Sequence, residues 1–129
     1  MAKFVEMDEQ VTLLKQMEDD VGGSVILINK FVIKAEDVDQ FVKAWTDDAT
    51  IFKQQPGFIS TQLHRGIAGS GTFINYAVWE SVAAYKEATS NVGIQARLSN
   101  YPASTVVSPH LFKKSSRSMS LISFLILNP

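Results

Sequence analysis

The spacing of apolar residues between Ser24 and Lys113 changes back and forth between the period of a strand and the period of a helix. The changes follow the order strand, helix, strand, strand, helix, strand. This order is the split βαβ arrangement, an α+β ferredoxin-like sandwich with an antiparallel sheet. The expected strands are residues 24–33, 58–66, 72–80 and 104–113, and the expected helices are residues 35–55 and 81–101, the second in two pieces.

Local signals set the ends of these segments. Pro56 and Gly57 end the first helix, because proline cannot continue its hydrogen-bond ladder. The loop "IAGSG" joins the second and third strands at hairpin length, and Ser81 is a suitable N-cap for the second helix. With the strands in the order 4-1-3-2, two helices leave one apolar face of the sheet uncovered. A second copy of the chain would bury that face, so we expect a homodimer.

Two extensions flank the domain, which we place at residues 23–113. Residues 1–22 carry apolar side chains at helical spacing with charged residues between them, which predicts an amphipathic helix packed on another surface. Residues 114–129 open polar and end apolar. This C-terminal extension has two interpretations, a strand added to a partner's sheet edge or an accidental change of reading frame.

Composition excludes several classes of protein. The 129 residues suit one domain, and 12 basic against 13 acidic residues form no basic stripe, so we expect no nucleic-acid partner. The absence of cysteine excludes disulfides, thiolate zinc sites and cysteine nucleophiles. The N-terminal segment lacks the apolar run of a secretory signal, and the C-terminal apolar run is about half of the roughly 20 residues that a membrane helix needs. We therefore expect a cytoplasmic protein that does not enter a membrane.

The third strand, "FINYAVWES", carries an amide on its apolar face. Its alternation places Asn75 and Trp79 on the same side as Phe73 and Ala77. A buried amide without a partner costs on the order of 1–3 kcal/mol, so Asn75 is either bonded structurally or faces a pocket. Trp79 is either a core residue or a flat surface for an aromatic ligand, with one N–H to donate. The residues alone leave both alternatives open.

The segments "QPGFISTQLHRG" and "GTFINYAVWESVAAYKEA" resemble the antibiotic biosynthesis monooxygenase (ABM) superfamily. The resemblance covers roughly residues 24–113 and, within the superfamily, is greatest to the cofactor-independent monooxygenase of actinorhodin biosynthesis. It implies that two copies form a dimeric α+β barrel, in agreement with the order of elements. The P-G-F and N-Y-A-x-W-E-S motifs are its most specific parts, although members with other activities share them.

The resemblance also implies site residues. In the actinorhodin-type enzyme an Asn and a Trp on the third strand, a Tyr in the next helix and a later Arg surround the substrate. The motif places the first three at Asn75, Trp79 and Tyr85, and the arginine at Arg97 if a short gap is allowed. Asn29, on the strand expected beside them, is a further substrate-binding candidate. The alternatives are an ordinary boundary tyrosine for Tyr85 and a solvated surface residue for Arg97.

The two histidines determine whether the sequence predicts a metal site or a haem site. His64 has a counterpart in the actinorhodin-type sequence and is a second substrate-binding candidate, although an edge-strand histidine is commonly solvated. His64 and His110 are expected on opposite edge strands, too far apart to share a metal, so we predict no metal site. The haem-degrading branch of the superfamily uses an Asn that Asn29 matches, but its Trp and its iron-ligating His fall near Ala88 and Leu98. The axial ligand for haem is therefore missing.

Three functions follow. The first is a cofactor-independent monooxygenase that oxidises an electron-rich aromatic, such as a phenol, anthrone or hydroquinone, with dioxygen to a quinone. It needs no cofactor because the deprotonated aromatic itself reduces dioxygen, while Asn75 and Trp79 hold its oxygens, Tyr85 handles a proton and Arg97 stabilises negative charge. The second is a non-catalytic dimeric barrel that binds a small hydrophobic metabolite. The third is a haem-handling protein.

Overall fold

The computed structural model describes residues 1–19 and 21–115. The strands are β1 (Lys3–Phe4), β2 (Val25–Val32), β3 (Phe58–Arg65), β4 (Thr72–Trp79) and β5 (Val106–Phe112). The helices are α1 (Leu13–Glu18), α2 (Val38–Phe52), α3 (Val82–Val92) and α4 (Ile94–Leu98), with a 3₁₀ turn, η1 (Ala35–Asp37), before α2. The C-terminal extension predicted at residues 114–129 lies outside the described residues from residue 116 onward.

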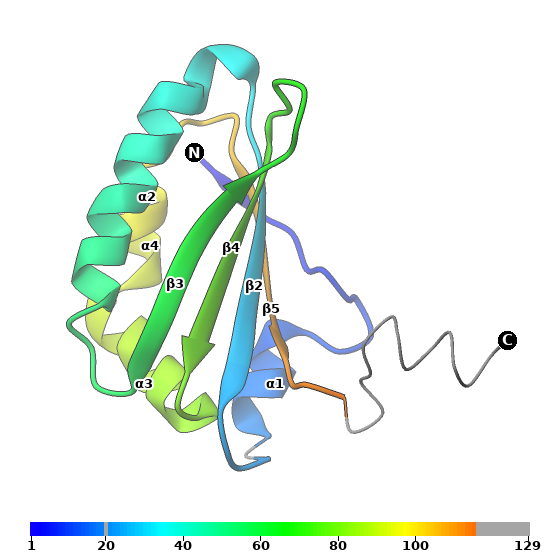
Figure 1. The fold of residues 1–129 in the computed structure, drawn as a ribbon, viewed down its shortest axis with the longest axis vertical. Helices are drawn as coiled ribbons and strands as arrows, with labels where there is room; N and C mark the ends of the chain where they lie inside the picture. Colours follow the sequence, from blue (N-terminus) through cyan, green and yellow to red (C-terminus); the bar gives the residue numbers. More distant parts are fainter. Residues whose placement is uncertain (20, 116–129) are drawn as a thin grey trace, which may run out of the picture.

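The five strands form one mixed sheet in the order β1-β5-β2-β4-β3 (Figure 1). β2 pairs antiparallel with both β4 and β5, and β3 pairs antiparallel with β4. β1 adds a short parallel pairing at the outer edge of β5. The predicted ferredoxin-like α+β fold is therefore confirmed, with β5, β2, β4 and β3 in the expected order. The strand β1 was not predicted.

The N-terminal segment differs from the single helix predicted over residues 1–22, because only α1 is helical there. Upstream of α1, the Asp8 carboxylate accepts hydrogen bonds from the backbone N–H groups of Gln10 and Val11, at 2.9 and 3.2 Å. Such a local side-chain turn competes with a helix for the same backbone groups. Thr12 then caps α1. The predicted helix was wrong in extent because apolar spacing does not register these local bonds.

Helices α2, α3 and α4 lie against one face of the sheet (Figure 1). The odd-numbered residues of β2 and β4 point toward them and are mostly buried, as the strand period requires. The core forms two clusters on this face. In one, Phe41 of α2 is fully buried with its ring centroid 4.9 Å from those of both Phe31 and Phe73. The other gathers around Trp79.

The opposite face of the sheet carries mostly apolar side chains along β2 and β4, with the exposed Lys30 among them. Even-numbered strand residues point there, and Ile28 lies between Tyr76 of β4 and His110 of β5 by register. Val32 and Tyr76 are 42% and 39% exposed, although both belong to central strands. We call this surface the open sheet face.

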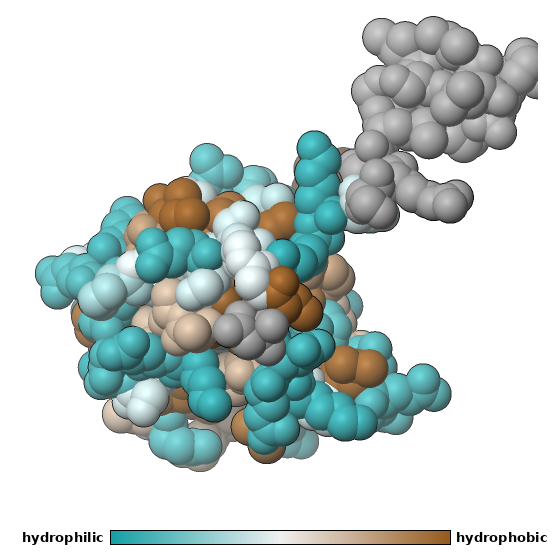
Figure 2. All heavy atoms as spheres, turned by 90° about the horizontal axis from the view of Figure 1, so that it is seen from below, coloured by the Kyte–Doolittle hydropathy of each residue, from teal (hydrophilic) through white to brown (hydrophobic). Residues whose placement is uncertain are grey.

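The surface at the end of the molecule near α1 and α3 is more hydrophilic than the open sheet face. Figure 2 shows hydrophilic side chains there, with small hydrophobic groups between them. Among the described residues, no helix is long and apolar enough to cross a bilayer.

One side chain fixes α1 to the free edge of β5. β1 pairs with β5 only as far as Val107. Further along the edge, Gln16 Oε1 accepts from the Leu111 N–H at 2.9 Å and Gln16 Nε2 donates to the Leu111 carbonyl at 2.9 Å. The side-chain amide thus replaces a backbone partner. Because these bonds fix which amide atom is nitrogen, His110 Nε2, at 3.1 Å from Gln16 Nε2, accepts.

Candidate functional site

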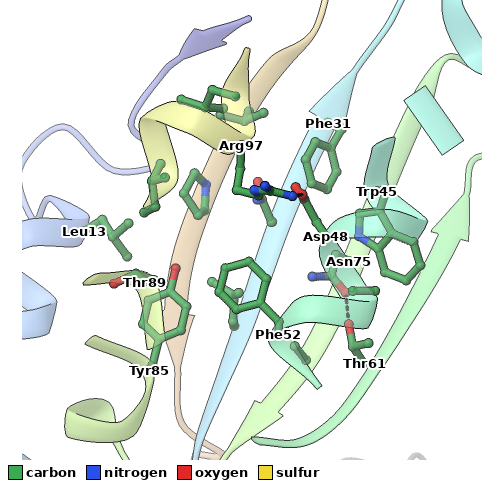
Figure 3. A pocket seen from close by; sticks show the side chains of 18 of the residues that line it. Leu13, Phe31, Trp45, Asp48, Phe52, Thr61, Asn75, Tyr85, Thr89 and Arg97 are labelled. Atoms are coloured by element: carbon green, nitrogen blue, oxygen red, sulfur yellow. Dashed lines mark hydrogen bonds and ion pairs between the residues drawn. The ribbon is translucent and has the colours of Figure 1, made fainter. Parts of the chain in front are cut away.

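A cavity of about 140 Å³ lies between the helices and the sheet (Figure 3). Apolar side chains form most of its wall, among them Leu27, Phe52 and Ile94. Both core clusters contribute, since Phe31 belongs to one and Trp79 to the other. A single water needs only about 10–15 Å³ of such space, so the cavity has room for a small molecule.

Asn75 and Asn29 form a cross-strand pair in the cavity wall. They lie directly opposite each other on β4 and β2, and both line the cavity. The Thr61 hydroxyl on β3 donates to Asn75 Oδ1 at 2.5 Å, and the Ser108 N–H on β5 donates to Asn29 Oδ1 at 3.2 Å. The amide nitrogen of Asn75 points into the cavity (Figure 3). Both alternatives for Asn75 are therefore correct, because one end of the amide is anchored and the other faces the cavity.

Trp79 closes the cavity beside an aromatic cluster. It is 2% exposed, and its ring makes edge contacts with Phe52, Phe58 and Tyr85 at centroid distances of 6.2, 5.4 and 5.7 Å. Its indole N–H is buried without an acceptor among the described residues. Trp79 is thus a core residue that keeps one unused donor at a cavity.

Gly57, from the P-G-F motif, fixes the junction of β4 and α3. Its φ is +85°, and a Cβ added there would lie 2.4 Å from the Ala84 Cβ, so only glycine fits. Its carbonyl accepts from the Glu80 N–H at 2.8 Å. Ser81 then caps α3 by accepting from the Ala84 N–H at 3.0 Å, as predicted. This packing sets the start of α3 and with it the position of Tyr85.

Tyr85 lies on the buried side of α3 and lines the cavity. Burial raises the pKa of its phenol above the ordinary value. The group is therefore protonated at neutral pH. It can donate a hydrogen bond or a proton to a ligand, and it accepts a proton only after it has given one up.

Arg97 joins the site through two residues that the sequence reasoning missed. Its Nη1 lies 3.5 Å from Asp48 Oδ1, and the Tyr101 hydroxyl donates to Asp48 Oδ2 at 2.7 Å. All three line the cavity, and Figure 3 shows Arg97 and Asp48 pointing toward each other. Burial raises the pKa of Asp48, against the opposing effects of Tyr101 and Arg97. Burial and the charge of Asp48 raise the pKa of Tyr101.

A sequence signal for Asp48 existed. It falls on the apolar stripe of α2, three residues after Trp45 and four before Phe52. Its side chain is accordingly buried, with 8% of the residue exposed. A carboxylate at such a position predicts a buried partner, because charged groups are rarely buried unpaired.

The N-terminal extension contributes to the cavity wall as well. Phe4 of β1 and Leu13 of α1 both line it. Leu13 is 5% exposed and packs in the cluster around Trp79. The extension therefore packs on another surface, as its apolar spacing indicated, and that surface includes the site.

The histidines lie elsewhere. His64 is exposed on β3 and pairs in register with Ile74, whereas the neighbouring Leu63 pairs with Asn75. The alternation of the strand thus places His64 on the face away from the cavity, and the structure does not bring this candidate to the others. His110 is bonded to Gln16. Residues 1–19 and 21–115 contain no group of three His, Asp or Glu side chains that could hold a metal ion.

The fold and the cavity define a class of protein, a ferredoxin-like α+β domain with an apolar cavity between its sheet and its helices that carries a few polar groups. Aromatic walls, unused N–H donors, a buried phenol and an arginine suit a ring system that carries oxygen atoms. Residues 24–96 match the family described as antibiotic biosynthesis monooxygenase (ABM). The match spans more than half of the chain, so the chain belongs to this family, and the resemblance seen in its motifs is confirmed.

Solved structures agree with the fold. SnoaB, a cofactor-independent oxygenase from Streptomyces nogalater, is similar with a TM-score of 0.67 and 23% identity, over 78% of this chain and 98% of that chain. A "putative monooxygenase" from Shewanella loihica PV-4 has a TM-score of 0.65 and 27% identity, over 74% and 97%. A variant of MhuD with two manganese protoporphyrin IX molecules bound per active site has a TM-score of 0.59 and 23% identity, over 74% and 99%. No curated protein sequence matches this chain.

Proposed function

We propose that this protein is a cofactor-independent monooxygenase that oxidises an electron-rich phenol, anthrone or hydroquinone with dioxygen to a quinone. The observation that carries the proposal is the convergence of Asn29, Asn75, Trp79, Tyr85 and Arg97 on one apolar cavity. The narrower likeness to the actinorhodin-type enzyme is part of this proposal. The name of SnoaB as a cofactor-independent oxygenase supports it at the level of the fold.

The proposed reaction balances without a further reactant. An anthrone loses a proton to solvent, and its anion gives one electron to dioxygen. The two radicals combine to a peroxide anion, which takes up a proton. Loss of the ring C–H proton then breaks the O–O bond and leaves the quinone, and the departing hydroxide takes up the proton from solvent to form water. Trp79 and the amide pair would hold the substrate oxygens, and Arg97 would stabilise the anion and the peroxide. Burial raises the pKa of the Tyr85 phenol, so the group stays protonated; it would give its proton to the peroxide anion and take back the proton of the ring C–H.

Dioxygen uptake with the anthrone dithranol, after exhaustive treatment with EDTA, tests this reaction. Asn75→Ala and Trp79→Phe should each lower kcat/KM by about 10²-fold, the effect of removing one donor to a developing oxyanion. Trp79→Phe keeps an aromatic ring and removes the N–H. Asn91→Ala, an asparagine exposed on α3, is the matched control and should leave uptake unchanged. Ordinary rates in both cavity variants would remove the site assignment.

A non-catalytic ligand-binding protein is the second candidate, and the unused donors of the apolar cavity favour it equally. It predicts that an anthrone or quinone raises the melting temperature without dioxygen uptake. Uptake above the uncatalysed rate in the unchanged chain would exclude it.

A haem-handling function fits the residues less well. MhuD is a structural relative with porphyrin bound, and Asn29 lies in the cavity as the haem-degrading branch would require. The residues that line the cavity in the described ranges include no histidine, however, so the cavity wall provides no axial histidine ligand for haem iron. Haem titration should give no shift of the Soret band, and a saturable shift would support a haem-handling function.

The proposal includes a homodimer. The open sheet face presents Ile28 and Tyr76 from central strands, and a second copy placed on it by a two-fold axis would bury both. A barrel formed in this way would screen the back of the sheet that carries the amide pair. The cytoplasmic location expected from the sequence also stays a prediction.

A further inference from the structure

The two amides in the cavity wall are oriented by their neighbours. The Ser108 N–H can only donate, so the atom of Asn29 that lies 3.2 Å from it is the oxygen. On the other side of the pair, the Thr61 hydroxyl donates to Asn75 Oδ1 at 2.5 Å. Both oxygens are therefore engaged by the flanking strands. The NH₂ groups bond to no described residue, and that of Asn75 faces the cavity (Figure 3).

The other polar groups of the cavity repeat this pattern. Trp79 Nε1 and Arg97 Nε are buried and have no acceptor among the described residues. Both oxygens of Asp48 are engaged, one by the Tyr101 hydroxyl at 2.7 Å and one by Arg97 Nη1 at 3.5 Å. Each amide and carboxylate oxygen in the described wall thus already accepts one bond, whereas Trp79 Nε1 and Arg97 Nε have no acceptor there.

The donors are also distributed along the cavity. Asn75 and Trp79 are four residues apart on β4 and point to the same face of the sheet, which separates their Cα atoms by about 13 Å. Their side chains extend inward from these positions. The amide pair and Trp79 therefore provide donors at separate points of the cavity wall.

We propose that the cavity selects its ligand by hydrogen-bond polarity: it binds a flat aromatic dicarbonyl, or the corresponding oxyanion, in preference to the same rings carrying hydroxyl groups. A hydroxyl has to place its own proton on an acceptor, and each amide and carboxylate oxygen here already accepts one bond that the hydroxyl would have to share, whereas a carbonyl oxygen or an oxyanion uses the free donors directly. The inference rests on the proposed function, since it concerns the same cavity. If the inference holds, the quinone product binds more tightly than the hydroquinone form and inhibits turnover.

Anaerobic calorimetric titration compares three ligands of one ring size: 1,4-naphthoquinone, 1,4-dihydroxynaphthalene kept reduced, and naphthalene. The chain has no cysteine, so thiol addition to the quinone does not interfere. The quinone should bind about five- to tenfold more tightly than the dihydroxy compound, which corresponds to one hydrogen bond left unmade. It should also bind more tightly than naphthalene, which has no oxygen.

Two substitutions should change this ratio. Asn75→Asp replaces the NH₂ donor with an acceptor of the same shape and should invert the preference toward the dihydroxy compound. Asn91→Asp makes the same chemical change on the exposed side of α3 and should leave the ratio unchanged. Thr61→Val keeps the shape of Thr61 and removes the group that orients Asn75, so the ratio should fall toward one.

These outcomes decide the proposal. Equal affinities in the unchanged chain, a stronger affinity for the dihydroxy compound, no saturable binding of any of the three ligands, or a ratio that neither Asn75→Asp nor Thr61→Val alters would each overturn it. Thr61→Val serves if Asn75→Asp fails to fold. Because the titrations exclude dioxygen, a chain that shows the quinone preference and yet consumes no dioxygen contradicts only the proposed function.

Discussion

Tyr101 connects the cavity wall to the core through its two ends. Its ring lies 6.0 Å from that of Phe31 and 5.6 Å from that of Phe41, while its hydroxyl donates to the buried Asp48 at 2.7 Å. Tyr101→Phe keeps the ring and removes the donor, which leaves a buried carboxylate oxygen short of one partner. We expect the free energy of unfolding to fall by about 1–3 kcal/mol, as measured by urea denaturation.

Thr50→Val is the matched control for this change. Thr50 is exposed on α2, and its hydroxyl donates to the Thr46 carbonyl at 3.0 Å. Its loss should alter stability by less than about 0.5 kcal/mol. If the two variants were equally stable, the bond between Tyr101 and Asp48 would contribute nothing to the free energy of unfolding.

At the residue scale, the sequence predicted which side chains line the cavity better than it predicted their hydrogen-bond partners. The motif located Asn75, Trp79 and Tyr85, and all three line the cavity. Thr61, the partner of Asn75, could not be predicted because it depends on the register between β3 and β4. Asp48 was not predicted, although it lies on the apolar stripe of α2, because apolar periodicity does not distinguish a buried polar residue from an exposed one.

At the scale of elements, α1 depends on one side chain for its place. Gln16 satisfies both the N–H and the carbonyl of Leu111 at the edge of β5. Gln16→Ala should leave both groups without these partners and loosen α1, which carries Leu13 in the cavity wall. We expect faster exchange of the Leu111 amide hydrogen and a loss of about 1–3 kcal/mol in the free energy of unfolding, the effect of two hydrogen bonds.

Gln10→Ala tests whether the effect is specific. Gln10 is exposed in the preceding loop, and its side chain bonds to no described residue. Exchange at Leu111 should keep its rate in this variant. Unchanged protection of Leu111 in Gln16→Ala would mean that α1 is held by apolar packing alone.

The elements themselves were predictable where periodicity and end signals agreed. β2, α2 and the hairpin of β3 and β4 have strong spacing and clear breakers, and they appear where expected. β1 has two residues and pairs only because β5 offers a free edge, so no local pattern could reveal it. α1 differs from β1, because local signals, the Asp8 turn and the Thr12 cap, set its start, and its apolar spacing does not.

At the scale of the whole molecule, the order of elements specified the fold, but the cavity could not be derived from it. A ferredoxin-like domain can fill the space between sheet and helices completely. Here Asn29 and Asn75 keep part of that space polar, and aromatic side chains packed around Trp79 form part of the cavity wall. Whether such groups converge depends on side-chain packing, which strand order does not determine.

The open sheet face supports the last prediction, on the proposed homodimer. Ile28 lies at its centre, between Tyr76 and His110, so Ile28→Lys would bring a charge and its two-fold copy into one buried interface. Sedimentation velocity should show the unchanged chain at the mass of two copies and this variant at the mass of one. Val42→Lys, on the 37% exposed side of α2, makes the same change away from the sheet and should remain dimeric. A single-copy mass for the unchanged chain would contradict the dimer, and the open face would then have to be stable in water with its central apolar residues exposed.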